Sequence, residues 1–110
     1  MMSAEKGKVE RSSGNVFADL GLPEADIELL KAELVTRIDE IIRQRRLTQV
    51  QAARLLRLSQ PDVSRLLRGN FQDYSVERLF RLVTALGRDV EIVIRKPRSR
   101  RQGKLSIEAA

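Results

Sequence analysis

The sequence contains no cysteine, no histidine and no tryptophan. Without cysteine there is no disulfide framework and no thiolate metal site. Without histidine as well, the commonest general bases, nucleophiles and transition-metal ligands are missing, so catalysis would have to rest on carboxylates, lysines or hydroxyls. No pair of carboxylates is spaced for such work. The composition argues against an enzyme, and we expect neither a metal nor another cofactor.

Aromatic residues are scarce, at 4% of 110 residues, and no apolar run is long enough to span a bilayer. The core must therefore come mainly from Leu, Ile, Val and Ala, which favours an all-α protein. The length suits one small domain with some unpacked ends. Because a signal peptide and cysteine are both absent, we expect a cytoplasmic protein that does not contact membranes.

The chain is organised around the stretch TQVQAARLLRLSQPDVSRLLRG, from Thr48 to Gly69. Thr48 is a good N-cap for a helix over 49–56. Ser59 restarts the pattern, with Asp62 three residues later in a capping-box-like arrangement, and Gly69 is suited to end the second helix. The apolar residues recur at helical spacing: Ala52, Ala53, Leu56, Val63, Leu66 and Leu67. The stretch predicts two short helices joined by a tight turn.

The second of these helices should expose side chains that reach base edges or phosphates, namely Gln60, Pro61, Ser64, Arg65 and Arg68. In a helix-turn-helix the N-terminal part of the second helix enters the DNA major groove, where Arg can bind guanine and Gln can bind adenine. Periodicity alone fits an ordinary helical hairpin with a solvated basic face equally well.

Positive charge is concentrated in two places. Seven arginines and a single acid lie between Arg43 and Arg68, so this stretch equals the whole net charge of +6. A second basic run lies near the C-terminus and contains Arg95, Lys96, Arg98, Arg100, Arg101 and Lys104. Clustered arginine indicates a polyanion-binding surface with strongly salt-dependent affinity, and the alternative is a solvated charged surface.

The chain divides into five regions by composition. These are a disordered tail (1–14), an apolar N-terminal segment (15–23), a helical domain (24–87), a strand (88–97) and a basic flexible tail (98–110). Within the domain, helical periodicity also predicts a long helix from 23 to about 45 and another over 76–86.

The predicted strand is marked by the alternating residues Val90, Ile92 and Ile94. A lone strand cannot satisfy its backbone groups. We expect these residues to form a dimer by antiparallel pairing with the same strand of a second subunit, which would hold two recognition helices about 34 Å apart. The alternatives are pairing with the segment 16–20 or with a toxin-like partner.

The run RRLTQVQAARLLRLSQPDVSRLLRG, followed by SVERLFRLVTALG, resembles the lambda-repressor and Cro-like helix-turn-helix domain of the XRE family, over about 38–87. The flanks GNVFADLGLPEAD and ALGRDVEIVIRKP are similar to HigA-like antitoxins of type II toxin-antitoxin systems. The resemblance implies an all-α bundle of about five helices with one C-terminal β-strand, paired across a homodimer.

The same resemblance implies a sequence-specific repressor of double-stranded operator DNA. Gln49 would contact the DNA backbone, with Thr48 beside it, and Pro61, which replaces a more usual polar residue, would contact a thymine methyl group. The implied DNA-binding residues are Thr48, Gln49, Gln60, Pro61, Ser64 and Arg65, with Arg68 and Asn70 holding phosphates.

HigA-like antitoxins repress their own operon and neutralise an RNA-cleaving toxin of the RelE fold. The resemblance makes the N-terminal apolar residues candidates for the toxin contact: Val16, Phe17, Leu20 and Leu22. The same segment could instead pack against the chain's own core. Two other interpretations are a stand-alone XRE-type regulator without a toxin and a structural nucleoid or scaffold protein without a preferred DNA site.

Overall fold

A computed structural model describes residues 23–97, 99–100 and 103–108. The described residues contain four helices: α2 (Glu24–Gln44), α3 (Gln49–Leu56), α4 (Gln60–Leu67) and α5 (Val76–Ala85). Their bounds lie within one residue of the predicted ones, so the all-α fold is confirmed. The predicted number of helices is not confirmed, because about five were predicted and the described part of the chain has four. The predicted tail 1–14 and the predicted segment 15–23, apart from Pro23, lie outside the described residues.

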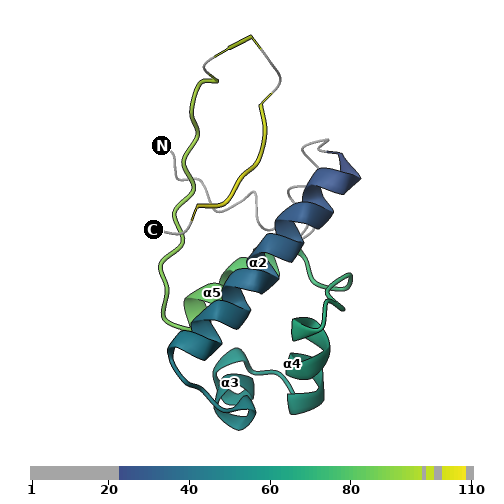
Figure 1. The fold of residues 1–110 in the computed structure, drawn as a ribbon, viewed down its shortest axis with the longest axis vertical. Helices are drawn as coiled ribbons and strands as arrows, with labels where there is room; N and C mark the ends of the chain where they lie inside the picture. The colour runs from purple at the N-terminus through teal and green to yellow at the C-terminus, as the bar shows by residue number, and fades with distance from the viewer. Residues whose placement is uncertain (1–22, 98, 101–102, 109–110) are drawn as a thin grey trace.

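The long helix α2 is the framework on which the other helices pack. It lies against α5 and α4, while α3 contacts α4 and α5. In Figure 1, α3 and α4 lie together at the lower end of the molecule, and the chain after α5 runs toward the other end. The helical pair predicted from the sequence is therefore presented at one end.

One hydrophobic core joins the four helices. Its largest fully buried side chains are Ile38, Val63, Leu66, Val76, Leu79 and Leu86. Burying each of them stabilises the fold by about 1.5–3 kcal/mol relative to exposure. Tyr74 and Leu82 are also buried, although periodicity did not single them out. No polar or charged residue is buried among the described residues, so the ionic groups lie on the surface.

Side-chain caps fix where three of the helices begin. The hydroxyl oxygens of Thr48, Ser59 and Ser75 each accept a hydrogen bond from an amide three residues later, at 3.1 Å. Thr48 also closes a full capping box, because its own amide donates to the side chain of Gln51 at 2.9 Å. Of the capping-box-like arrangement predicted at Ser59 and Asp62, the structure has the Ser59 cap, and the Asp62 carboxylate accepts a hydrogen bond from Arg65.

The predicted strand 88–97 is not formed in the single chain. Figure 1 shows this segment running extended away from α5, and none of the backbone hydrogen bonds between described residues involves 89–97. The reason is physical, because an extended segment becomes a strand only when a neighbour satisfies its backbone groups. Pairing across a dimer is accordingly absent from this single-chain structure and stays a prediction.

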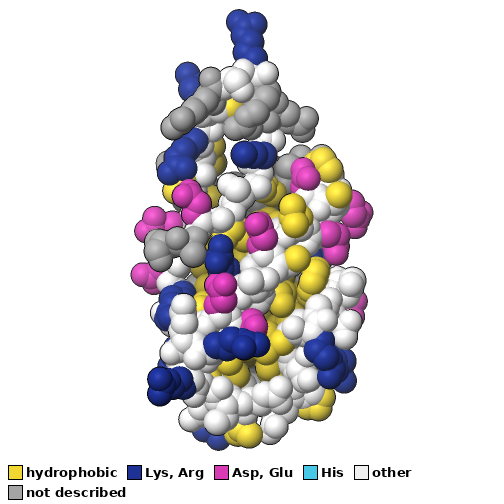
Figure 2. All heavy atoms as spheres, viewed as in Figure 1, with side chains coloured by type: hydrophobic (Ala, Val, Ile, Leu, Met, Phe, Trp, Pro, Cys, Tyr) yellow, Lys and Arg dark blue, Asp and Glu magenta, His cyan; other side chains and the backbone are white. Residues whose placement is uncertain are grey.

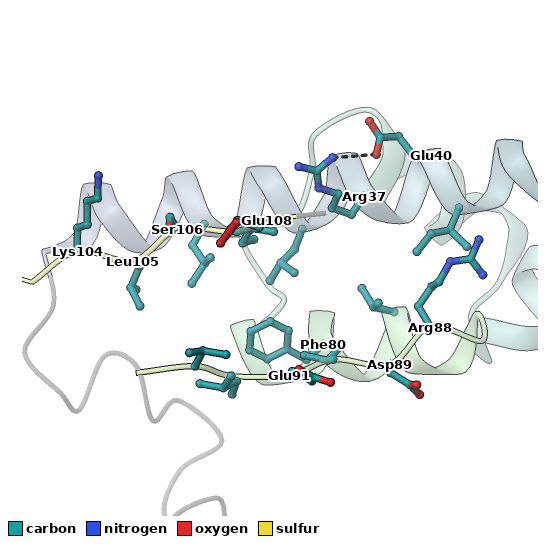
Figure 3. A pocket seen from close by; sticks show the side chains of 18 of the residues that line it. Arg37, Glu40, Phe80, Arg88, Asp89, Glu91, Lys104, Leu105, Ser106 and Glu108 are labelled. Atoms are coloured by element: carbon teal, nitrogen blue, oxygen red, sulfur yellow. Dashed lines mark hydrogen bonds and ion pairs between the residues drawn. The ribbon is translucent and has the colours of Figure 1, made fainter. Parts of the chain in front are cut away.

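A cavity of about 460 Å³ lies between α2, α5 and two segments of the C-terminal part of the chain, residues 88–93 and 104–108. Figure 3 shows residues 104–108 running beside α2, with the ring of Phe80 pointing from α5 into the space between. Val90 and Ile107 are half-buried against the core. Ile107, which belongs to the predicted flexible tail, thus contacts the helical domain.

Candidate nucleic-acid interface

The turn between α3 and α4 fixes the orientation of the second helix. Arg57, the C-cap of α3, adopts the left-handed conformation with φ 57°, and the next amide, of Leu58, donates to the carbonyl of Ala53 at 3.0 Å. Ala52 and Ala53 are buried, and their small side chains let α4 approach α3 closely. The two short helices therefore form a compact unit whose inner faces are covered.

The eight residues predicted to bind DNA all belong to this unit or to the turn after it. Val63 and Leu66 hold the inner face of α4 in the core at 0% exposure. Exposed around the outer face are Thr48, Gln49, Gln60, Pro61, Arg65, Arg68 and Asn70, and Ser64 is half-buried. We call these eight residues the α3–α4 surface. The predicted set is accessible as a group at one end of the molecule.

The charge on this end is mostly positive. Figure 2 shows Lys and Arg side chains around the lower end, where α3 and α4 lie, while Asp and Glu side chains are more frequent along the middle of the molecule. Helix α3 has no acidic residue in its first turn, whereas α2, α4 and α5 each have one or two. The positive end of the α3 helix dipole, at Gln49, therefore has no acidic side chain of its own first turn beside it. This arrangement favours the binding of an anionic group there.

Arg65 is held by a carboxylate on its own helix. Its Nη2 donates to Oδ1 of Asp62 at 2.5 Å, and both side chains are about half exposed. This hydrogen bond is the main reason why the pKa of Asp62 lies below its usual range, and the Ser59 hydroxyl lowers the pKa further. The spacing of three residues on a helix was visible in the sequence and could have predicted this pair.

A polar hollow continues from this pair toward α5. It is lined by Asp62, Arg65, Asn70, Asp73, Tyr74 and Arg78. The guanidinium carbon of Arg78 lies 4.4 Å from the centre of the Tyr74 ring, a cation–π contact with a buried aromatic platform. Arg78 also lowers the pKa of Asp62 by its charge. Sequence reasoning missed Tyr74 and Arg78, since both stand outside the helical repeat of the motif.

The second basic run does not join the α3–α4 surface. Arg95, Lys96, Arg100 and Lys104 are exposed, and the segments that carry them lie toward the upper end in Figure 1, away from α3 and α4. The candidate toxin-contacting residues Val16, Phe17, Leu20 and Leu22 lie outside the described residues. None of the described helices combines the length and the apolar character that a membrane span requires. The described residues also contain no group of three or more acidic side chains placed to hold a metal ion.

Three comparisons relate the chain to known proteins. A family model described as a helix-turn-helix domain matches residues 16–95. A solved structure described as an XRE-family transcriptional regulator is 44% identical in sequence, with a TM-score of 0.75, over 80% of this chain and all of that one. A comparison with curated proteins finds no match. By the extent of both matches, the chain belongs to the XRE-type helix-turn-helix family.

Proposed function

We propose that this protein is a sequence-specific DNA-binding transcriptional repressor that contacts its operator through the α3–α4 surface. The observation that carries the proposal is the exposed outer face of α4, which presents Gln60 and Arg65 on a helix whose inner face is fixed in the core. Major-groove recognition needs such a rigid helix with donor and acceptor groups along one side.

The residues of the surface take different roles in this proposal. Gln49 contacts the DNA backbone at the uncompensated end of α3, and Arg68 and Asn70 contact phosphates beyond the end of α4. Gln60, Pro61, Ser64 and Arg65 contact base edges. Phosphate contacts position the helix, while base contacts give the sequence preference.

The experiment is selection of bound duplexes from a random-sequence DNA library, followed by binding titrations at several salt concentrations. The expected result is one enriched motif whose affinity falls steeply with salt, because each neutralised phosphate releases counterions. If no motif is enriched and binding depends on salt but not on sequence, the result would instead indicate a structural nucleoid protein, the alternative named in the sequence analysis.

The proposed repressor acts as a homodimer joined through residues 88–97. Val90, Ile92 and Ile94 are the proposed contacts, as the sequence pattern predicted, and Ile92 and Ile94 are exposed in the single chain. A two-fold dimer would bind two half-sites about one DNA turn apart. The selected motif should then be a palindrome.

The finer proposal is that the repressor is also the antitoxin of a HigBA-type pair and neutralises a RelE-fold, RNA-cleaving toxin. Its support is the resemblance of the flanking sequences to HigA-like antitoxins, and the alternative is a stand-alone XRE-type regulator. The adjacent gene provides the probe: an antitoxin should bind the purified product of a small neighbouring open reading frame and relieve its growth arrest.

Deletion of residues 1–22 separates the two roles. An antitoxin that uses Val16, Phe17, Leu20 and Leu22 should lose toxin binding and keep DNA binding. A stand-alone regulator should show no interaction with the neighbouring gene product in either form. Binding that survives the deletion would place the toxin contact elsewhere on the chain.

A further inference from the structure

The segment after α5 has exposed apolar side chains, and its backbone groups lack hydrogen-bond partners among the described residues. Ile92, Val93 and Ile94 are 69%, 61% and 94% exposed. No backbone hydrogen bond between described residues satisfies the amides and carbonyls of 89–97. Three consecutive β-branched residues on an extended segment are a template for pairing with another strand.

The chain's own C-terminal residues do not supply that strand. Residues 104–108 face the segment across the 460 Å³ cavity (Figure 3). The polar contact between the two segments is an ion pair from Arg95 Nη1 to Glu108 Oε1 at 3.7 Å, with side chains 73% and 81% exposed. Such a surface pair contributes about 0–1 kcal/mol. Arg95 is therefore available for a better-placed carboxylate.

We propose that a second copy of this chain pairs antiparallel with residues 90–96, in the register that places the two-fold axis at Val93. In this register Ile92 lies opposite the partner's Ile94, and Glu91 lies opposite the partner's Arg95. The inference rests on the homodimer proposed above and assigns its register and its contacts.

Charge complementarity selects this register. Because successive side chains of a strand point to opposite faces, four isoleucines from the two copies gather on one face. The other face has the two Val93 side chains at its centre and one Glu91–Arg95 pair on each side. Opposite charges and β-branched pairs directly across an antiparallel ladder stabilise it.

The neighbouring two-fold registers are less well matched. An axis at Ile92 pairs Asp89 with the partner's Arg95, but it also places Arg88 opposite the partner's Lys96 and Glu91 opposite the partner's Val93. An axis at Ile94 places Ile92 opposite the partner's Lys96. Like charges directly across a ladder destabilise it, and a charge opposite an apolar residue gains no partner. The axis at Val93 leaves Lys96 in that position, opposite the partner's Val90, but it places no like charges opposite each other within 90–96. The axis at Val93 is therefore the best matched of the three.

Charge reversal tests the proposed pair, with oligomeric state measured by analytical ultracentrifugation of the full chain. Glu91→Arg and Arg95→Glu each put like charges opposite each other at two places, so each variant should raise the dimer dissociation constant about tenfold or more. The double variant Glu91→Arg/Arg95→Glu should restore the dimer. Mixing the two single variants should also restore it, since their heterodimer has two opposite-charge pairs.

Asp89→Arg is the matched control, because it makes the same charge change two residues from Glu91. It should leave the dimer unchanged, since Asp89 lies opposite Pro97 in the proposed register. In the register centred on Ile92, Asp89 would face the partner's Arg95 instead. A dimer weakened by Asp89→Arg and indifferent to Glu91→Arg would overturn the proposal.

A cysteine scan tests the axis directly, because the chain has no native cysteine. Val93→Cys places two thiols opposite each other, about 4.5–5.5 Å apart between Cα atoms, which a disulfide can bridge. Ile92→Cys and Ile94→Cys place them on the diagonal at about 7–8 Å, beyond its reach. Rapid oxidation to a covalent dimer is expected for Val93→Cys alone. Cross-linking of Ile92→Cys in its place would overturn the register.

A chain that is monomeric at all concentrations would overturn both this inference and the proposed homodimer. The duplex selection described above would then still enrich a single half-site if the DNA-binding proposal is correct. A dimer that forms without dependence on Glu91 and Arg95 would overturn the register alone.

Discussion

The guanidinium group of Arg65 lies 2.5 Å from the carboxylate of Asp62, one turn earlier on the exposed side of α4. An arginine proposed to contact a base is thus occupied by a carboxylate in the free protein. Because Arg65 holds the pKa of Asp62 below its usual range, that carboxylate is ionised near neutral pH. Binding to a guanine must either replace this contact or keep it alongside the new one.

Replacement of Arg65 by alanine should reduce sequence discrimination with little effect on the fold. A bidentate contact to guanine contributes about 1–3 kcal/mol of discrimination, so the selected motif should lose its preference at one position of each half-site. Arg81→Ala is the matched control, because Arg81 is exposed on α5 outside the α3–α4 surface. Titration of the selected duplex against single-base variants measures the effect. Equal discrimination by both variants would remove Arg65 from the base contacts.

Asp62→Asn should increase affinity for unrelated duplex DNA. The substitution removes a negative charge that would face phosphates and releases Arg65 from its ion pair. Asp73→Asn removes the same charge from the same polar hollow and should give the electrostatic part of the gain alone. Affinities at fixed salt should rank Asp62→Asn above Asp73→Asn and both above the unmodified protein. An equal gain in the two variants would show that releasing Arg65 adds nothing.

The ion pair also predicts a pH dependence of stability. Since the folded protein lowers the pKa of Asp62, the pair contributes stability above the carboxylate's unfolded pKa and loses it as pH falls through the folded pKa. The difference in melting temperature between the unmodified protein and Asp62→Asn should therefore be largest near neutral pH and shrink in acid. A difference that is constant from neutral to strongly acidic pH would contradict this assignment.

The helices and their caps were predictable because they depend on local sequence. The hydroxyls of Thr48 and Ser59 and the spacing of apolar residues define α3 and α4 whatever surrounds them. Contacts between distant residues left no such signal. The hydrogen bond from Arg45 to the carbonyl of Leu86 joins residues 41 positions apart, and Ile107 reaches the core from beyond the predicted strand. The predicted strand is not formed for a related reason, because no backbone hydrogen bond between described residues involves 89–97.

Because the backbone of Arg57 is left-handed, we expect glycine at this position to be more stabilising than alanine, the reverse of the usual order in a helix. A non-glycine residue with positive φ costs about 1–2 kcal/mol, so Arg57→Gly should be more stable than Arg57→Ala by about 1 kcal/mol. At Arg54, inside α3, the order should be reversed, because glycine in a helix is about 1 kcal/mol worse than alanine. Urea denaturation of the four variants gives the comparison. The same order at both positions would contradict the left-handed turn.

A hydrogen bond between the ends of α2 and α5 predicts that two neighbouring arginines differ in their contribution to stability. Nη1 of Arg45 donates to the carbonyl of Leu86 at 2.9 Å, joining residues 41 positions apart in the sequence. Among the described residues, the Arg43 side chain pairs with Asp39 on its own helix, and it is 77% exposed. A partly buried hydrogen bond from a charged donor contributes about 1.5–3 kcal/mol, whereas a surface pair contributes about 0–1 kcal/mol.

Arg45→Met should consequently lower the free energy of unfolding by at least about 1 kcal/mol more than Arg43→Met. Methionine keeps most of the apolar stem in both variants, so the difference isolates the guanidinium group. Leu86 is itself fully buried, and its carbonyl lies at the C-terminal end of α5, where helix carbonyls lack intrahelical partners. Chemical denaturation measures both free energies of unfolding. If Arg45→Met and Arg43→Met lower them equally, water replaces Arg45 at the Leu86 carbonyl without cost, and the end of α5 is solvated and not held against α2.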